Sequence, residues 1–391
     1  MRLPERVQAG GAPAQRPGRP LPRPRSGLPH VCFVAPALWP VLSDDPAIPV
    51  IGGAEVQQRL LARLFARAGY PVSVVSCDFG QPQPAFAHGI TVHKTFRPDA
   101  GLPVLRFLHP RLTATWQALT RADADIYYVR AASMLVGVVA RFCRRRGRRS
   151  VYAAASDADF VPGHRQIRYA RDRLLYEHGL RSVDQVVVQN AAQLAACRRH
   201  FGRNATLIPS GYEPPPQARL GGGDLVLWVG RVIPGKRAEL FLELARRLPA
   251  RRFALVGGAG DDAAYAERIR REAAALPNVE CTGFLPLAAT EAWFDRARVL
   301  VNTSFYEGMP NTFLQAWARG VPTVATVDVG APVQQVFAEP AAGAALIERL
   351  YTDAAAFAQA SRACRAYFEQ MHSADAVLAH YARLFEEACP A

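Results

Sequence analysis

Lysine is nearly missing from this chain. Among its 47 basic residues only Lys94 and Lys236 are lysines, so arginine supplies almost all of the positive charge. Lys236 ends the run LWVGRVIPGK (227–236), in which an apolar strand stops at a glycine and a helical pattern begins shortly afterwards. A compact ammonium on a flexible stem acts as a point charge toward phosphate, a task for which a planar guanidinium is less suited. We therefore predict that Lys236 binds phosphate.

Long apolar runs and paired cysteines are missing as well. No apolar run approaches the roughly 18 residues that a membrane-spanning helix needs. The seven cysteines contain no C-x-x-C pair and are scattered along the chain. This spread argues against a disulfide framework or a zinc site and favours a reducing compartment. We therefore expect a cytoplasmic protein.

The first 27 residues lack an apolar centre and are rich in arginine and proline. They do not match a secretory signal, which needs a hydrophobic core. Their composition is typical of a disordered arm. Half of the 391 residues of the whole chain are hydrophobic, which indicates a globular body. The length is sufficient for two or three domains.

Part of the net charge of +14 is concentrated in the run RFCRRRGRR (141–149), at the end of a helical pattern. One interpretation is a peripheral contact with an anionic membrane, at the inner face. A second is nucleic-acid binding, which we do not expect because no nucleic-acid motif is present. A third is a solvated helix end, where arginines favourably face the negative end of the helix dipole.

Short β-branched runs alternate with helical stretches along the chain, which predicts an α/β protein with parallel sheets covered by helices on both faces. A segment rich in proline and glycine, 209–223, interrupts the alternation. We predict two doubly wound, Rossmann-like domains that face each other across a cleft, with ligands at the carboxyl ends of the strands. The expected divisions are an arm (1–27), a first domain (28–208), a linker (209–223), a second domain (224–365) and a terminal helix that packs back on the first domain (366–391).

The run NTSFYEGMPNTFLQAWARGVPTVAT (302–326) predicts a strand, a polar turn, a helix at about 311–318 and another strand. Gly308 would let the backbone approach a ligand, and Asn311 or Thr312 could cap the helix. The free N–H groups of the first helical turn form an anion site. Glu307 is better suited to accept hydrogen bonds from hydroxyl groups. A carboxylate beside a phosphate site predicts a ligand that is part sugar and part phosphate.

At these residues the chain resembles the GT-B glycosyltransferases, and within them the retaining enzymes of family 4. The resemblance extends over roughly residues 28–390, although only a few segments are specific. The family places an arginine and a lysine after the first strand of its second domain, matched here by Arg231 and Lys236. It also places a Gly-Gly-x-Glu turn near the N-terminus, matched by Gly52, Gly53 and Glu55. The resemblance implies that the first domain (28–208) binds the acceptor and the second (224–365) the nucleotide sugar, and that Arg231 and Lys236 neutralise the diphosphate of a sugar nucleotide.

The family also has two glutamates eight positions apart. The first is matched by Glu307, which would bind sugar hydroxyls, and the second position, which usually holds the ribose, is Gln315 here. An amide loses the charge assistance of a carboxylate, worth on the order of 1 kcal/mol. The backbone after Gly308 would bind sugar and phosphate, and the ends of two further strands would frame the base. The remaining donor-binding residues expected on these grounds are Gly258, Phe284, Met309, Pro310, Asn311 and Thr312.

Three further residues are candidates for the cleft or for the sugar acceptor. The family often carries a histidine at the end of a strand of the first domain, but the matching strand (150–156) ends in alanine and serine. His164 is the nearest imidazole, and Arg130 ends another strand. Asp157 belongs to a D-x-D pair that follows a strand. Two carboxylates alone make a weak metal site, so we expect no metal and no cofactor apart from the nucleotide-sugar substrate.

These features predict a glycosyltransferase that moves a sugar from a nucleotide-sugar donor to a hydroxyl of a glycan or lipid-linked acceptor, with retention of configuration. Rival interpretations stay open. A sugar-nucleotide epimerase shares the architecture but needs acid and base groups near the sugar. A glycogen-type phosphorylase would need a cofactor lysine. Gln315 and the missing histidine also permit a sugar-nucleotide-binding protein without catalysis.

Overall fold

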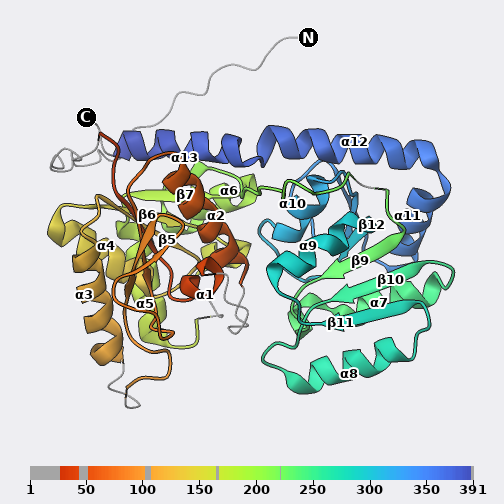
Figure 1. Cartoon of the computed structure of the whole chain (residues 1–391), viewed down its shortest axis with the longest axis horizontal. Helices are drawn as coiled ribbons and strands as arrows, with labels where there is room; N and C mark the ends of the chain where they lie inside the picture. Colours follow the sequence, from red (N-terminus) through yellow and green to blue (C-terminus); the bar gives the residue numbers. More distant parts are fainter. Residues whose placement is uncertain (1–26, 44–51, 102–106, 164–166, 221, 389–391) are drawn as a thin grey trace, which may run out of the picture.

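A computed structural model describes residues 27–43, 52–101, 107–163, 167–220 and 222–388 (Figure 1). Almost all of the predicted N-terminal arm, and the candidate His164, lie outside these ranges. The described chain forms two α/β lobes, each built around its own sheet, and a pair of long helices runs along both (Figure 1). The α/β fold class and the two predicted parallel sheets are confirmed.

The first lobe contains an eight-stranded sheet in the order β3-β4-β2-β1-β5-β6-β7-β8. Its central strands are short runs of mostly buried apolar and aromatic side chains, as expected of strands covered on both faces, whereas the strands at its two edges are partly exposed. The strands are β1 (Val31–Val34), β2 (Val72–Ser76), β3 (Ala85–Ala87), β4 (Ile90–Lys94), β5 (Ile126–Arg130), β6 (Arg149–Ala153), β7 (Gln185–Val188) and β8 (Thr206–Leu207).

One edge of this sheet departs from the predicted all-parallel pattern. Strands β3 and β4 were not predicted from the sequence, and β3 pairs antiparallel with β4. The two strands are joined by His88 and Gly89, both with positive φ (52° and 77°). Such a pair forms the two-residue turn that matches the twist of a hairpin. Histidine is an uncommon first residue for this turn, so the usual sequence signal was absent.

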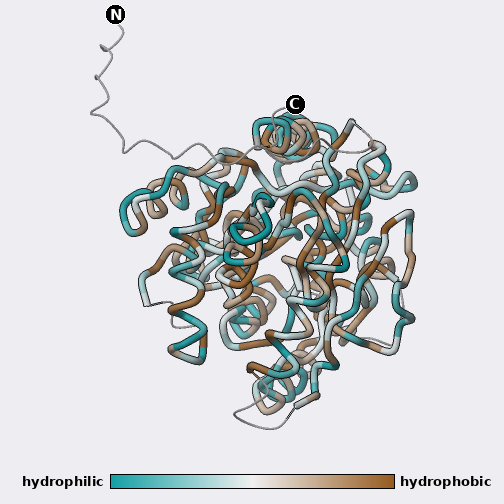
Figure 2. Tube along the Cα trace, turned by 90° about the vertical axis from the view of Figure 1, so that its left-hand side faces the viewer, coloured by the Kyte–Doolittle hydropathy of each residue, from teal (hydrophilic) through white to brown (hydrophobic). Residues whose placement is uncertain are grey.

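Helices cover both faces of the first sheet, and two separate apolar cores lie between the helices and the strands. The helices and helical turns of this lobe are α1 (Leu38–Leu42), α2 (Gly53–Arg67), η2 (Leu108–Leu112), α3 (Thr113–Ala122), α4 (Leu135–Arg146), η3 (Asp157–Phe160), α5 (Ala170–Ser182) and α6 (Ala191–Phe201). Apolar residues gather in the strands inside the molecule, and hydrophilic stretches lie on the outer helices and loops (Figure 2).

The second lobe contains a six-stranded, fully parallel sheet in the order β11-β10-β9-β12-β13-β14. Two more apolar cores cover its faces. Its strands are β9 (Leu225–Val229), β10 (Arg252–Val256), β11 (Val279–Gly283), β12 (Ala297–Asn302), β13 (Thr323–Ala325) and β14 (Gln334–Val336). Its helices are η4 (Pro234–Lys236), α7 (Ala238–Arg247), α8 (Ala263–Ala274), α9 (Leu287–Asp295), α10 (Asn311–Trp317) and α11 (Pro340–Thr352).

The chain ends in two long helices, α12 (Ala354–Met371) and α13 (Ala374–Ala388). Helix α12 lies along the second lobe and α13 along the first (Figure 1). Val377, Tyr381, Leu384 and Phe385 form an apolar stripe on α13 that is buried in a core of the first lobe, at the spacing of one helix face. The exact domain boundaries stay a prediction. Within the described residues, no helix combines the length and apolar character needed to cross a membrane.

His372 sits where α12 passes to α13, and it is 1% exposed. Its Nδ1 lies 2.8 Å from the Ser210 carbonyl oxygen, its Nε2 has no partner, and the rings of Trp317 and Tyr367 pack against it. Burial lowers the pKa of His372 from 6.5 to about 4, and the hydrogen bond to Ser210 opposes this effect. The imidazole is therefore neutral in the folded protein at neutral pH.

This burial makes the free energy of unfolding depend on pH. Above pH 6.5 the imidazole is neutral in both states, and below it the unfolded chain takes up the proton first. We expect about 3 kcal/mol of stability to be lost as the pH falls from 6.5 to about 4. The free energy of unfolding, measured with denaturant, should fall between pH 7.5 and pH 5. Compared with the wild type, this fall should be smaller in His372→Gln and unchanged in the exposed control His380→Gln. Equal drops in all three proteins would contradict this assignment.

Candidate functional site

A cavity of about 530 Å³ lies between the two lobes. Segments that follow the carboxyl ends of strands in both sheets form its walls, which is where doubly wound domains bind ligands. Most of the sequence-predicted site residues line it: Gly52, Gly53, Arg130, Arg231, Lys236, Gly258, Phe284, Glu307, Gly308, Met309, Pro310, Asn311, Thr312 and Gln315. The structure thus brings together residues that are far apart in the sequence.

The cationic side of the cavity comes from the turn between β9 and α7. Arg231 is exposed, and its guanidinium has no partner among the described residues. The turn η4 begins with Pro234, whose fixed φ suits a helix start, and the following Arg237 donates its Nε to the Thr303 carbonyl oxygen at 2.7 Å. This bond ties the turn to the end of β12 and so fixes the stem of Lys236.

Glu307 holds the ammonium of Lys236 through one of its two oxygens. Its Oε1 accepts from Lys236 Nζ, from Ser304 Oγ at 2.6 Å and from Asn302 Nδ2 at 3.2 Å. Its Oε2 has no hydrogen-bond partner in the described part of the chain. The side chain is only 13% exposed. One oxygen is therefore committed to the protein, and the other is available to accept a hydrogen bond from a ligand hydroxyl.

Helix α10 begins differently from the prediction. Its N-cap is Pro310, which has no side-chain oxygen, so neither Asn311 nor Thr312 caps the helix. Asn311 instead donates its Nδ2 to the Gly53 carbonyl oxygen at 3.0 Å and accepts from Gln57 Nε2 at 2.7 Å. Gly53 and Gln57 belong to α2 of the first lobe. The amide that was expected to cap the helix therefore joins the two lobes across the cleft.

Gly308 allows its loop in the second lobe to lie close to the first lobe. A Cβ atom at this position would lie 2.7 Å from the Ala155 carbonyl oxygen and 3.3 Å from Gln189 Oε1, both in the first lobe. No side chain fits at such distances without movement. The glycine therefore lets the loop 307–310 close against the end of β6. Gly308 also lines the cavity, and its predicted contact with a ligand stays a prediction.

Arg130 lines the first-lobe side of the cavity and is buried. It donates to Tyr128 Oη at 3.3 Å and to Ser210 Oγ at 3.0 Å, while its buried Nε has no partner. Burial raises the pKa of the neighbouring Glu55, and the charges of Arg231 and Arg130 oppose that shift. The Gly-Gly-x-Glu turn therefore places a carboxyl group within electrostatic reach of one arginine from each lobe.

The two aspartates of the D-x-D pair, Asp157 and Asp159, accept hydrogen bonds from neighbouring protein groups. Asp157 Oδ1 accepts from Asn190 Nδ2 at 3.2 Å and from Gln193 Nε2 at 2.8 Å, and Asp157 is not among the residues that line the cavity. Asp159 is buried and accepts from Tyr152 Oη and from the Ala155 amide. In the described ranges, no group of three or more histidine, cysteine, aspartate or glutamate side chains is arranged to hold a metal ion.

Glu291 of α9 lines the cavity and was not predicted from the sequence. Its Oε1 accepts from Gln315 Nε2 at 2.8 Å, and its Oε2 accepts from Tyr212 Oη at 2.6 Å and from Arg319 at 2.9 Å. These partners lie on other elements, so nothing local distinguishes Glu291 from a surface glutamate. The available signal was Arg319, an arginine in the turn after α10 that is 0% exposed and needs anionic partners, which are Glu291 and Asp295.

Two protein-family profiles match the chain. Residues 51–214 match the profile described as Glycosyltransferase Family 4, and residues 223–365 match the profile described as Glycosyl transferases group 1. The two matches fall on the first and the second lobe, and each contains its half of the residues that line the cavity.

Among curated proteins, the chain is similar to the D-inositol 3-phosphate glycosyltransferase of Mycolicibacterium smegmatis, with 28% identity over 257 residues that cover 60% of this chain and 59% of that protein. The enzyme of the same name from Mycolicibacterium paratuberculosis is 27% identical over 245 residues, covering 58% and 56%. The matched region thus spans less than two thirds of the length of these relatives.

Solved structures share the fold over almost the whole chain. Sucrose-phosphate synthase from Thermosynechococcus elongatus has a TM-score of 0.74 and 20% identity, covering 92% of this chain and 98% of that chain. Anabaena HepE, solved in complex with UDP and glucose, has a TM-score of 0.69 and 18% identity, covering 91% and 99%. The catalytic domain of starch synthase IV from Arabidopsis thaliana, bound to ADP and acarbose, has a TM-score of 0.66 and 13% identity, covering 93% and 100%.

Proposed function

We propose that this chain, which belongs to the group 1 glycosyltransferases of family 4 and has their GT-B fold, transfers a sugar from a nucleotide-sugar donor to a hydroxyl group. One observation carries the proposal. Arg231, Lys236 and Glu307 meet in a single cavity between the lobes, and they offer two cations beside a carboxylate oxygen without a partner. A diphosphate that carries a sugar presents the complementary groups.

The donor would lie mostly against the second lobe. The diphosphate would face Arg231 and Lys236, and the sugar hydroxyls would face Glu307. Gly258 and Phe284 would border the base, and a Cβ at Gly258 would already lie 2.7 Å from Phe284 Cβ, so only glycine leaves this contact unstrained. Structural neighbours that hold UDP or ADP support a nucleoside diphosphate at this position. Neither the nucleotide nor the sugar is set by these residues.

The ribose end of the donor site differs from the family pattern. Gln315 lacks the usual carboxylate, but its amide donates to Glu291, which brings a carboxylate from α9 to the same part of the cavity. Arg319 balances the charge of Glu291 through a bond of 2.9 Å. We infer that Glu291 and Gln315 together accept hydrogen bonds from the ribose hydroxyls, which would offset the loss of the second family glutamate.

The reaction breaks the bond between the anomeric carbon and the diphosphate oxygen and forms a bond to the oxygen of the acceptor hydroxyl. The sugar becomes oxocarbenium-like, and the leaving diphosphate gains negative charge. Arg231 and Lys236 would face that developing charge, and they would therefore stabilise the transition state more than the ground state. Retention of configuration, with the hydroxyl attacking from the face that the diphosphate leaves, is our expectation from the family. The hydroxyl proton departs with the released nucleoside diphosphate or to water.

Lys236 has a matched control, because the chain has only one other lysine. We expect Lys236→Ala to lower kcat by ~10²-fold or more, as for the loss of one preorganised donor. Lys94→Ala should leave kcat unchanged, since Lys94 forms an ion pair with Asp78 at 3.2 Å on β4, outside the cavity. Steady-state release of the nucleoside diphosphate measures both variants. Unchanged turnover in Lys236→Ala would remove this lysine from the mechanism.

Incubation with donor alone separates sugar transfer from epimerisation. The end of β6 presents Ala155 to the cavity and offers no acid or base group there. We therefore expect no new sugar nucleotide from UDP-, GDP- or ADP-sugars in the absence of an acceptor. Formation of an epimerised donor would overturn the assignment, and binding without turnover across acceptors would indicate a non-catalytic binding protein.

A thermal-shift panel of the same donors identifies the nucleotide, because the preferred nucleotide sugar should raise the melting temperature most.

A peripheral membrane contact through residues 141–149 is a further proposal. Arg148 and Arg149 pair with aspartates, but Arg141, Arg144 and Arg146 are exposed and have no partner in the described part of the chain. We expect binding to vesicles with anionic lipids, weakened by 0.5 M salt and by changing these three arginines to glutamine. Equal sedimentation of both proteins with anionic vesicles would exclude the cluster as the contact.

A further inference from the structure

A second cavity, of about 330 Å³, opens in the first lobe and is called the side cavity here. Val34, Ser76 and Ala132 line it, so it lies at the carboxyl ends of β1, β2 and β5. Ala132 is two residues after Arg130, which lines the cavity between the lobes. The Cα atoms of these two residues are at most ~8 Å apart. Both cavities therefore lie at the carboxyl edge of the first sheet, with lining residues two positions apart where β5 ends.

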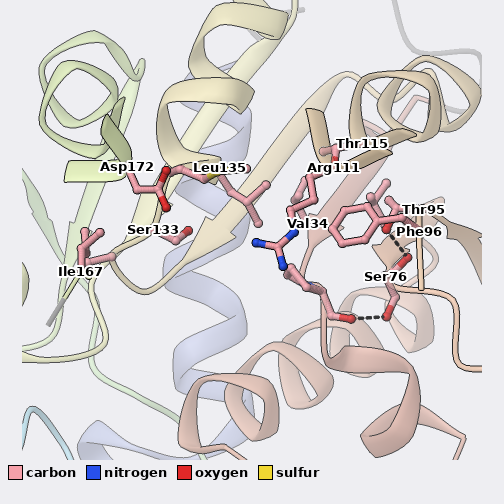
Figure 3. Close-up of a pocket in the computed structure, with 14 residues that line it drawn as sticks. Val34, Ser76, Thr95, Phe96, Arg111, Thr115, Ser133, Leu135, Ile167 and Asp172 are labelled. Carbon is pink, nitrogen blue, oxygen red and sulfur yellow. Dashed lines mark hydrogen bonds between the residues drawn. The ribbon is translucent and has the colours of Figure 1, made fainter. Parts of the chain in front are cut away.

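One cation projects into the side cavity. Figure 3 shows the guanidinium of Arg111 pointing into the space between Phe96 and Ser133. Its Nε is buried without a partner, and the guanidinium makes no hydrogen bond or ion pair among the described residues. Its closest aromatic contact is with Phe96, whose ring centre is 6.0 Å away. A charged donor left without an acceptor is costly when it is shielded from water, and a bound anion would supply the missing acceptors.

The opposite end of the side cavity has the opposite charge. Asp172 lies across from Arg111, and one of its oxygens accepts from Arg171 Nε at 3.2 Å (Figure 3). A carboxylate repels a second anion but accepts hydrogen bonds from hydroxyl groups. Between the two ends the walls are mostly apolar, with Val75, Leu135 and Ile167 among them. Such walls suit the C–H faces of a sugar or cyclitol ring.

We propose that the side cavity binds the sugar acceptor, and that this acceptor is a small polyhydroxylated molecule with one anionic group, a phosphate or a carboxylate, bound by Arg111. The assignment rests on the proposed sugar transfer. It adds the chemical class of the acceptor and names the residue that selects it. The hydroxyl that reacts is the one directed past Ala132 toward the donor, and its oxygen forms the new bond to the anomeric carbon.

Direct binding tests the assignment without relying on turnover. Calorimetric titrations use hexose phosphates, inositol phosphates, hexuronates and their neutral parents against the full chain. The variants are Arg111→Gln, which removes the charge, Arg111→Lys, which keeps it, and Arg121→Gln. Arg121 is a matched control because it lies on α3 and is exposed, with a bond only to the Lys94 carbonyl oxygen. Lys236→Ala is included because weaker binding in this variant would show that a probe binds in the cavity between the lobes and not in the side cavity.

The wild-type chain should bind at least one anionic probe about 10- to 100-fold more tightly than its neutral parent, the range expected for a charge-assisted hydrogen bond. This preference should vanish in Arg111→Gln, survive in part in Arg111→Lys, and stay unchanged in Arg121→Gln and Lys236→Ala. Comparing the affinities of the phosphate probes with those of the hexuronates shows whether a phosphate or a carboxylate is preferred. Absence of any preference in the wild type, or its persistence in Arg111→Gln, overturns the assignment.

A second readout separates this inference from the proposed function. Slow release of nucleoside diphosphate from the donor, without any acceptor, should be equal in Arg111→Gln and in the wild type, because Arg111 does not line the donor cavity. If the wild type binds anionic probes through Arg111 but turns over no donor, sugar transfer fails and the anion site stands. If donor is turned over but neutral and anionic acceptors are used equally, the anion site fails and sugar transfer stands.

Discussion

The site depends on the ion pair between Lys236 and Glu307. An isolated ammonium would be mobile, and an isolated carboxylate beside a phosphate site would repel the ligand. Bound to each other, they are held by short segments that end β12 and start α7, with Ser304 and Asn302 fixing the same carboxylate oxygen. The two side chains are 29% and 13% exposed, so the pair is shielded more than a surface pair. Such a pair orders the cleft before any ligand arrives.

Order within the second lobe would be of little use if the lobes were free to separate. Asn311 bonds to α2, and Gly308 brings its loop against Ala155, so the same short segment that binds in the site also joins the lobes. The long helices α12 and α13 connect the lobes on another side, with the buried His372 at their junction. The loop that lines the cavity is therefore also the loop that joins the lobes.

Local patterns were sufficient for much of the fold and for the centre of the site. The apolar runs of β1, β5 and β9 could be identified without neighbours, because burial on both faces leaves a continuous apolar run. Arg231, Lys236 and Glu307 could be identified because they stand at strand ends. The hairpin of β3 and β4 was missed because its His88-Gly89 turn is atypical. The helix cap suggested for Asn311 was wrong, and its actual partners could not be foreseen because they are more than 250 residues away in the sequence.

The positions of the positive charges bear on the kind of acceptor. Helix α4 begins at Leu135, which lines the side cavity, and its arginine-rich end at Arg146 lies about 16 Å further along the helix axis. That end leads into the start of β6, so the arginine cluster lies at the edge of the sheet opposite to the cavities. A membrane bound there would not face the cleft, and a lipid-linked acceptor would have to pass around the lobe. A small anionic acceptor that reaches Arg111 from solvent meets no such obstacle, and this geometry favours it whether or not the cluster binds membranes.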